Sequence, residues 1–206
     1  MCHWGGLSPS PARAVHNWDF TPQPMCQSTL RYISLIIRKP LIQLEKLNPS
    51  LTAVLQEVAT VVKLRSQLMS MKKYLIVCRI AMEEKLLKLL HERMHFVDNA
   101  NVYSFQDLID INSGELLNYL KNILIRFKSH IITCMLCMAK SFVCEICVSP
   151  EKECLFPFDD GVDVCHVCEA VFHRDCFRSV SSCPRCDRKK DKKENKTSSV
   201  FTVDIL

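Results

Sequence analysis

The chain has 206 residues, of which 48% are hydrophobic and 13 are cysteine, and its formal net charge is +5. This hydrophobic share supports a folded core, whereas four glycines are too few for Gly-rich phosphate loops or a many-turned all-β fold. The opening residues, MCHWGGLSPS, contain no apolar signal core, and no apolar run reaches the roughly 18 residues that span a bilayer. We therefore expect a cytoplasmic chain, in which thiols stay reduced and clustered cysteines bind metal.

Residues 1–27 hold four prolines and no hydrophobic period, which predicts an extended, irregular lead-in. Trp4, Trp18 and Phe20 lie in this segment. Aromatic side chains in an irregular segment usually pack on a folded body, so we expect the lead-in to be pinned rather than free.

Residues 28–133 predict a helical region. Asn48-Pro49 interrupts it, and Ser50 can cap the next helix. The apolar face of that helix is expected to hold Leu51, Val54, Leu55, Val58, Val61, Val62 and Leu68. A second helix is predicted from about Met71 to His95, with Cys78 as a small buried hydrophobe among Leu75, Met82, Leu86, Leu89 and Leu90.

Ser104 and Asp107 form a capping-box pattern at the start of a short helix that runs through Ile111. A longer helix follows and leads into the first cysteine pair; its apolar positions are Leu116, Leu120, Ile123, Phe127 and Ile131. Two roles are open for this face. It can pack on the helices of residues 50–95, or Leu116, Leu120 and Phe127 can form a partner-binding surface.

Residues 134–190 predict a zinc-binding Cys/His module, since ten of the 13 cysteines lie between Cys134 and Cys186. Two thiolates separated by two residues can hold one tetrahedral zinc, and buried free thiols do not explain such regular spacing. The pairs are Cys134/Cys137, Cys144/Cys147, Cys165/Cys168, His173/Cys176 and Cys183/Cys186. They predict two or three Zn²⁺ ions as the cofactor. The expected fold is mainly α: a helical bundle followed by a zinc-stabilised, multi-site cysteine-rich module with short strands.

The eight ligands from Cys144 onward suffice for two four-coordinate sites. A cross-braced pairing would join Cys144, Cys147, His173 and Cys176 in one site and Cys165, Cys168, Cys183 and Cys186 in the other. A sequential pairing is the alternative, and spacing does not separate the two.

Cys134 and Cys137 then need a third zinc and two more ligands. His130, one helical turn earlier, is the candidate third ligand, and His95 is the candidate fourth. His130 could instead be a histidine favoured at a helix C-terminus by the dipole. Cys154 and His166 are expected to be spectators.

All these sites look closed, whereas catalytic zinc usually keeps one position open. The Gly-x-Ser-x-Gly, His-Glu-x-x-His and P-loop patterns do not occur in the sequence. We therefore expect no catalytic residues and no enzyme. Structural zinc, at about 10–16 kcal/mol per site in small peptides, would replace a core that so short a segment cannot build.

Residues 191–206 read as a flexible basic tail. Its charge is too weak for a nucleic-acid groove, so no nucleic acid is expected. A solvated tail is the simpler interpretation, and peripheral membrane contact or attraction to an acidic protein is the alternative.

Four stretches of the module resemble the zinc region of the Rubicon-homology family, which includes Rubicon and the pleckstrin-homology-domain family M adaptors. They are Phe142–Cys147, Leu155–Phe158, Ala170–Cys176 and Cys183–Cys186. Upstream, Pro11–Phe20, Met71–Tyr74 and His95–Val97 resemble a small member of the same family, and the resemblance covers about residues 2–190.

The resemblance implies a non-enzymatic adaptor on late endosomes and lysosomes that binds the active form of a Rab7-type small GTPase. It also implies other endolysosomal adaptors as partners and roles in autophagy, endocytic maturation and lysosome positioning. For the small member it implies peripheral lysosome distribution and ruffled-border formation in osteoclasts.

The chain departs from the family at its start. The resembling proteins have further cysteines just before the motif that is Cys2-His3-Trp4 here, and an upstream diacylglycerol-type zinc finger. Either the chain is an N-terminally truncated form or the first zinc site is lost, because two ligands cannot close a zinc site. Cys26 is the alternative partner for this half-motif.

Two rival functions remain. The ligand order from His130 to Cys183 is a near match to the phorbol-ester/DAG-type zinc finger, which binds membrane lipid, but only Gly161 is available for that module's Gly-rich groove. The same order resembles a RING-like ubiquitin ligase, although the gap between Cys176 and Cys183 is short. Val148 could contact an E2 enzyme there. The adaptor interpretation is favoured over both.

Overall fold

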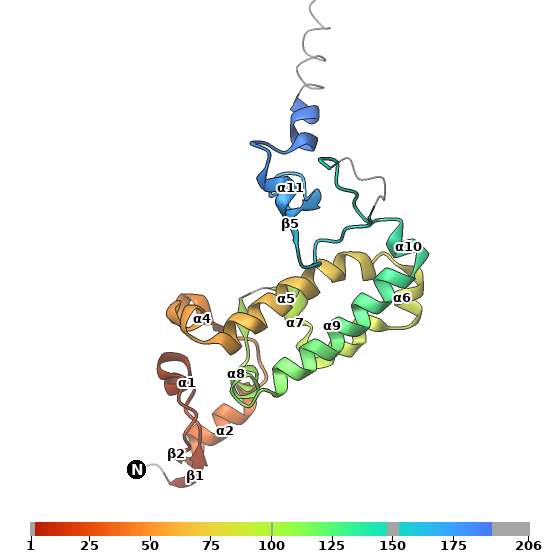
Figure 1. Ribbon diagram of the computed structural model, residues 1–206. Coiled ribbons are helices and arrows are strands. Elements are labelled where there is room, and N and C mark those ends of the chain that lie inside the picture. Colours follow the sequence, from red (N-terminus) through yellow and green to blue (C-terminus); the bar gives the residue numbers. More distant parts are fainter. Residues whose placement is uncertain (1–2, 100, 148–152, 191–206) are drawn as a thin grey trace, which may run out of the picture. The chain divides into compact units, whose positions relative to one another are not determined.

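The computed structural model describes residues 3–99, 101–147 and 153–190, and it divides the chain into two compact units, Met1–Thr133 and Cys134–Leu206. The first is a helical unit and the second a cysteine-rich unit with short strands (Figure 1). The predicted fold class, a helical bundle followed by a cysteine-rich module, is confirmed. The predicted tail, the half-motif residue Cys2 and the E2-contact residue Val148 lie outside the described residues.

The helical unit contains nine α-helices, one 3₁₀ helix and four short strands among its described residues. The helices are α1 (Pro11–Asn17), α2 (Gln27–Ile36), α3 (Leu44–Leu47), α4 (Ser50–Val54), α5 (Gln56–Leu75), α6 (Arg79–Glu83), η1 (Leu86–Arg93), α7 (His95–Asp98), α8 (Phe105–Asn112) and α9 (Glu115–Thr133). The strands form two antiparallel pairs, β1 (Trp4–Ser8) with β2 (Gln23–Cys26) and β3 (Ile42–Gln43) with β4 (Val102–Tyr103).

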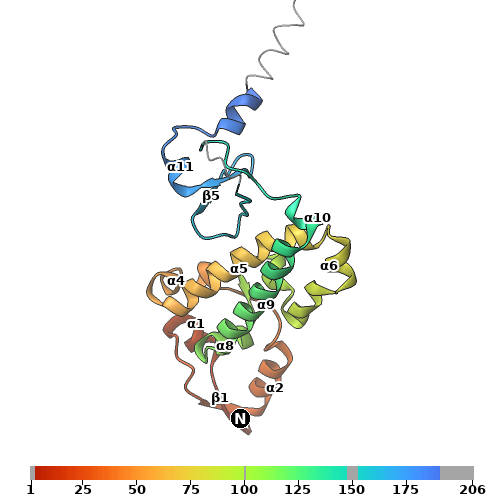
Figure 2. The ribbon, with the colours of Figure 1, turned by 45° about the vertical axis from the view of Figure 1, so that its right-hand side comes forward.

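The core of the helical unit lies between its two long helices, α5 and α9, which run side by side in both views (Figures 1 and 2). The buried positions of α9 are the predicted ones: Leu116, Leu120, Ile123, Phe127 and Ile131. They meet a buried face of α5 made largely of Val58, Val61, Leu64, Leu68, Met71 and Leu75. The partner-binding role predicted for Leu116, Leu120 and Phe127 is therefore wrong, because these three side chains have no exposed surface.

The helix α8 begins with the predicted capping box. The Ser104 Oγ accepts from the Asp107 backbone N–H at 3.1 Å, and the Asp107 carboxylate accepts from the Ser104 backbone N–H at 2.8 Å. These reciprocal bonds satisfy two backbone donors that the first turn would otherwise leave unpaired.

The single helix predicted from Met71 to His95 is wrong. The chain continues α5 to Leu75 and then breaks into α6, η1 and α7. Lys85 and His91 have positive φ angles, of 56° and 44°; Lys85 separates α6 from η1, and His91 kinks η1. No Gly or Pro marks these breaks, so the apolar period continued across them in the sequence and hid the turns.

The start of the first long helix also differs from the prediction. Ser50 is the first residue of α4 rather than a side-chain cap, and Leu55 is extended, which separates α4 from α5. Val54 consequently lies 75% exposed instead of on the apolar face.

The lead-in is more ordered than predicted, because it contains α1 and the β1–β2 pair. Pro11 occupies the first turn of α1, where its missing N–H costs no hydrogen bond. Phe20 packs on a cluster of Ala14, Ile33 and Phe105, as expected of a pinning aromatic. Trp4 is 69% exposed, so most of its side chain does not pack on the helices.

The cysteine-rich unit contains α10 (Met135–Met138), β5 (Val162–Val164), β6 (Val171–His173) and α11 (Arg174–Arg178) among its described residues. β5 and β6 pair as an antiparallel hairpin, and Phe142 pairs with Leu155 in an isolated bridge. Its main hydrophobic cluster is small and partly made of sulfur: Cys144, Leu155, Val162, Cys165, Ala170, Val171, Phe172 and Cys183.

Replacing Leu120 by Ala is expected to lower the free energy of unfolding of the helical unit by about 2–5 kcal/mol, because it opens a cavity between α5 and α9. Ile125→Ala on the same helix is the control, since Ile125 is 63% exposed; it should change stability by less than about 0.5 kcal/mol. Urea unfolding followed by circular dichroism measures both. Equal effects would show that the buried side of α9 is assigned wrongly.

Candidate metal centres

The first group of ligand atoms is Cys144, Cys147, His173 and Cys176. Cys144 follows closely after Phe142, which forms the bridge to Leu155. His173 is the last residue of β6, and Cys176 lies in α11. The His173 Nδ1 lies 3.4 Å from the Cys147 Sγ and 3.8 Å from the Cys176 Sγ. The hairpin and the helix that follows it therefore bring the His-x2-Cys pair to the Cys144/Cys147 pair.

The second group is Cys165, Cys168, Cys183 and Cys186. The first two lie in the turn between β5 and β6, and the last two in a tight turn where the Cys186 N–H donates to the Cys183 carbonyl at 2.9 Å. The Cys165 and Cys186 sulfurs are 3.7 Å apart, and those of Cys168 and Cys183 are 3.6 Å apart. Both groups have the cross-braced arrangement rather than the sequential one.

The spacing of these atoms suits a tetrahedral zinc. With Zn–S bonds of about 2.3 Å and Zn–N bonds of about 2.0 Å, two sulfurs on one ion lie about 3.8 Å apart and a sulfur and a nitrogen about 3.5 Å. The separations in both groups fall close to these values. The sulfurs are also much too far apart for disulfide bonds, which require about 2.05 Å.

Backbone N–H groups reinforce the first cysteine of each pair. The N–H groups of Ile146 and Cys147 donate to the Cys144 sulfur, and those of Val167 and Cys168 donate to the Cys165 sulfur. Such donors stabilise a thiolate, which is the form that binds metal. The two-residue spacing is therefore useful twice, because it aims both sulfurs inward and directs N–H groups at one of them.

The thiols of each group influence one another's ionisation. Burial opposes ionisation of Cys144, but the backbone N–H donors lower its pKa to about 6; donors led by that of Cys168 likewise lower the pKa of Cys165 to about 6. Burial and the neighbouring Cys144 raise the pKa of Cys176 to about 11, and burial together with Cys168 and Cys165 raises that of Cys186 to about 12. A cation among the sulfurs would favour the thiolate form of all of them.

The third group contains Cys78, His130, Cys134 and Cys137. His130 was the candidate third ligand beside Cys134 and Cys137, and the structure brings the three together. Cys78 takes the fourth place, with its Sγ 3.4 Å from the His130 Nε2. The interpretation of Cys78 as a mere buried hydrophobe is incomplete: the side chain is buried, but its sulfur is a potential ligand. Its distance in sequence from any other cysteine concealed this role.

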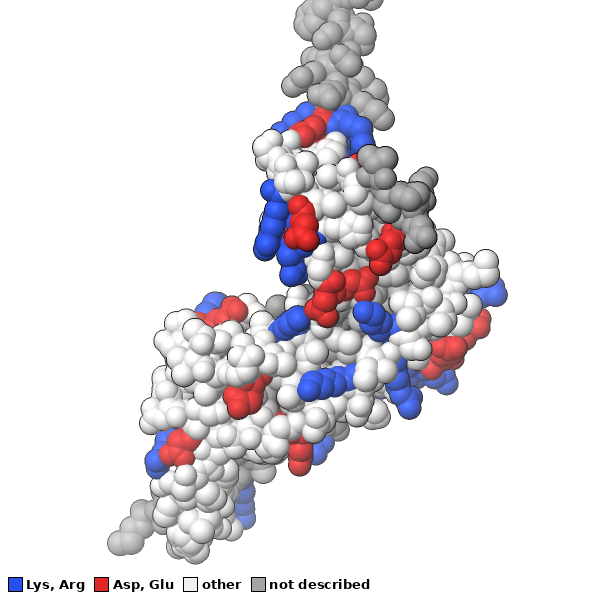
Figure 3. Space-filling view, in the orientation of Figure 1, with Lys and Arg blue, Asp and Glu red and all other residues white. Residues whose placement is uncertain are grey.

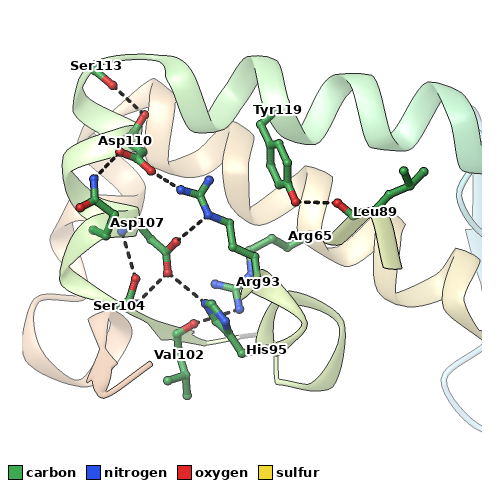
Figure 4. Close-up of polar contacts among 11 residues, drawn as sticks. Arg65, Leu89, Arg93, His95, Val102, Ser104, Asp107, Asp110, Ser113 and Tyr119 are labelled. Carbon is green, nitrogen blue, oxygen red and sulfur yellow. Dashed lines mark hydrogen bonds and ion pairs between the residues drawn. The ribbon is translucent and has the colours of Figure 1, made fainter. Parts of the chain in front are cut away.

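His95, the candidate fourth ligand, lies elsewhere. Its Nε2 is 2.9 Å from the Asp107 carboxylate, which also accepts the Ser104 backbone N–H (Figure 4). Burial opposes ionisation of Asp107, yet the hydrogen bonds from His95 and Ser104 keep its pKa below the usual value. His95 therefore belongs to a buried polar cluster of the helical unit, not to a ligand group.

Arginine side chains complete this cluster. Arg93 bridges Asp107 and Asp110, and Arg65 donates to the Val102 carbonyl (Figure 4). Arg65 also donates to the Asn99 carbonyl. The Arg65 guanidinium also lies 4.3 Å from the ring centroids of both Phe96 and Tyr103. No sequence pattern pointed to Arg65, since a lone arginine within an apolar helix usually extends to solvent.

A family model described as Rubicon Homology Domain matches residues 1–191. The chain belongs to the Rubicon homology family. Its cysteine spacing and its helical unit thus come from one family-wide region rather than from two unrelated ones.

Several curated proteins are similar to this Rubicon homology chain. The "Differentially expressed in FDCP 8 homolog" of Drosophila melanogaster is 39% identical over 194 residues, which cover 93% of this chain and 39% of that protein. The protein of that name from Caenorhabditis elegans is 36% identical over 199 residues, or 94% and 41%. The human "Pleckstrin homology domain-containing family M member 3" is 34% identical over 197 residues, or 95% and 26%. The chain thus spans about two fifths or less of the length of these relatives.

The purified chain is expected to carry three zinc ions, and their removal should unfold the cysteine-rich unit, because folding and metal binding there are one equilibrium. Elemental analysis counts the metal, and hydrogen exchange at β5 and β6 follows the fold after chelation. Retained protection of these strands in the metal-free chain would contradict the expectation.

Cys176→Ser should remove one zinc and lower the melting temperature, because Cys176 belongs to the first ligand group. Cys154→Ser is the matched control: Cys154 is exposed and belongs to none of the three groups. Zinc content and thermal melts of the two variants give the comparison. Equal losses would show that the ligand assignment is wrong.

Proposed function

We propose that this chain is a non-enzymatic, zinc-scaffolded adaptor that binds a Rab7-type small GTPase on late endosomes and lysosomes. In this role it would regulate lysosome positioning and endolysosomal and autophagic trafficking, together with other endolysosomal adaptors. The observation that carries the proposal is the presence of three four-ligand Cys/His groups within a Rubicon homology domain.

The ligand groups support a structural rather than a catalytic role for zinc. Each offers four Cys or His ligand atoms that lie within 4.8 Å of one another. Four protein ligands complete a tetrahedral shell, whereas catalytic zinc leaves a position for water or substrate. The metal would therefore fix the backbone and leave recognition to other surfaces.

The endolysosomal assignment rests on the family and on the resemblance to the pleckstrin-homology-domain family M adaptors. Ruffled-border formation in osteoclasts belongs to the same proposal. Within the part of the chain that the structure describes, no helix is both long and apolar enough to cross a bilayer. Basic and acidic side chains are interspersed on the face of the helical unit in Figure 3, so that face carries no single-sign electrostatic surface.

The GTPase would need an exposed face of the helical unit. The outer side of α9 offers one, because Ile125 is 63% exposed and Arg126 beside it is exposed as well. Protein interfaces commonly place apolar and Arg side chains at their centre. A rigid helix whose other side is buried against α5 suits such a role.

The lipid-binding alternative loses its main support in the structure. Its near match to a diacylglycerol-type finger begins at His130, yet His130 groups with Cys78 rather than with the eight ligands from Cys144 onward. The RING-like alternative rests on the order of the Cys/His ligands, with Val148 as the possible E2 contact. Val148 lies outside the described residues, and the comparisons lend this alternative no support. The adaptor function is therefore the better supported of the three.

A pull-down against a panel of GTP-locked and GDP-locked Rab proteins tests the proposal. Binding is expected for the GTP-locked Rab7-type protein alone, and zinc chelation should abolish it. Capture of no GTP-locked Rab, or equal capture of both nucleotide states, would contradict the adaptor function.

The proposed binding face has its own test in the same assay. Ile125→Asp should reduce capture at least tenfold, since a charge at an apolar interface centre is strongly disfavoured. Val54→Asp is the control because Val54 is 75% exposed on α4, away from the proposed face. Unchanged capture by the Ile125 variant would remove this face from the proposal and leave the GTPase partner standing.

A further inference from the structure

His130 is held on both sides of its ring by groups of the helical unit. Its Nε2 lies 3.4 Å from the Cys78 Sγ, and its Nδ1 lies 3.2 Å from the Glu84 Oε2. The His130 side chain is only 9% exposed, and Glu84 is 52% exposed. One ring nitrogen thus faces the ligand group and the other faces a carboxylate at the edge of solvent.

Both neighbours of His130 come from the same short helix. Cys78 is the N-cap residue of α6 and Glu84 is its C-cap residue. The backbone bonds Met82 N–H to Cys78 carbonyl, at 3.0 Å, and Glu84 N–H to Ile80 carbonyl, at 2.9 Å, fix the spacing of the two ends. A sulfur ligand and a carboxylate therefore reach His130 as one preformed unit.

The chemistry of the two neighbours fixes the state of the imidazole. An ionised carboxylate only accepts hydrogen bonds, so a neutral His130 carries its proton on Nδ1 and donates it to Glu84. The Nε2 lone pair then points towards Cys78. Metal-binding histidines commonly present a second nitrogen to a carboxylate, which orients the ring and increases its basicity.

We infer that Glu84 is a positioning residue that sets His130 as an Nε2 ligand of the third zinc. The inference rests on the proposed zinc binding by Cys78, His130, Cys134 and Cys137. Glu84 lies outside the Cys/His spacing pattern. Because Glu84 offers no ligand atom to the group, that pattern does not identify it.

The first ligand group provides an internal comparison. His173 presents Nδ1 to its sulfurs, and its Nε2 lies 3.6 Å from the Glu153 Oε2, beyond hydrogen-bond distance. Glu153 is also 74% exposed, against 52% for Glu84. A carboxylate effect on zinc affinity should therefore be much weaker at His173 than at His130.

The test compares Glu84→Ala and Glu84→Gln with Glu83→Gln in the full chain. Glu83 is the matched control, because it precedes Glu84 in sequence, is 66% exposed and pairs with Arg79 at 3.4 Å. Competition with a chromophoric chelator measures the affinity for each bound zinc ion. Glu84→Ala should weaken one of three sites by about 10–100-fold, and Glu84→Gln by less, because its amide oxygen still accepts from Nδ1. Glu83→Gln and Glu153→Gln should leave all three affinities within about twofold of the original chain.

Nitrogen NMR of the His130 ring separates positioning from general destabilisation. The original chain should show a protonated Nδ1 and a metal-bound Nε2, and Glu84→Ala should perturb the Nδ1 signal while the other sites keep their zinc. Affinity in Glu84→Ala equal to that in Glu83→Gln would overturn the inference, as would equal weakening of all three sites. If the unaltered chain binds only two ions, the third zinc itself fails and the inference with it; three ions with no Glu84 effect would refute the inference alone.

Discussion

Charge repulsion among thiolates is the constraint on which the cysteine-rich unit depends. Four sulfurs, or three sulfurs and an imidazole, lie within 4.8 Å of one another in each ligand group. Like charges this close oppose one another's ionisation, and burial together with the neighbouring Cys144 accordingly raises the pKa of Cys176. A dication at the centre turns that repulsion into attraction and draws together turns that a small apolar cluster could not hold.

The helical unit relies on a different balance. Its two long helices bury a continuous apolar face, and a buried polar cluster lies beside that face. Asp107 shows how the cost of burial is offset there, because its carboxylate accepts hydrogen bonds from Ser104 and His95 and forms an ion pair with Arg93. A buried charge with several partners fixes geometry more than it adds stability, since desolvation offsets much of the attraction. The polar cluster thus specifies how η1, α7 and α8 meet, while the apolar face supplies the stability.

The sequence predicted best those features that repeat at short range. Apolar residues at three- and four-residue steps gave the buried side of α9, the capping box gave the start of α8, and the Cys-x2-Cys spacing gave the members of two ligand groups. Features created by distant segments were missed. Cys78 lies 52 residues before His130, and no local pattern connects the two. The break at Lys85 and the kink at His91 occur at positive φ without Gly or Pro, so no residue type in the sequence marked them.

These missed breaks and the missed ligand have one physical origin. A single helix through residues 71–95 would carry Cys78 and Glu84 on a rigid rod, six residues apart, where they could not flank one imidazole. Because the chain turns after Leu75 and again at Lys85, the short helix α6 stands apart and presents both ends to His130. Binding a metal through Cys78 and His130 would close a loop of some fifty residues, and such closure removes a large amount of chain entropy from the unfolded state. The irregular backbone between α5 and α9, which sequence periodicity concealed, is therefore what permits a metal ligand and its carboxylate neighbour to act on the same histidine.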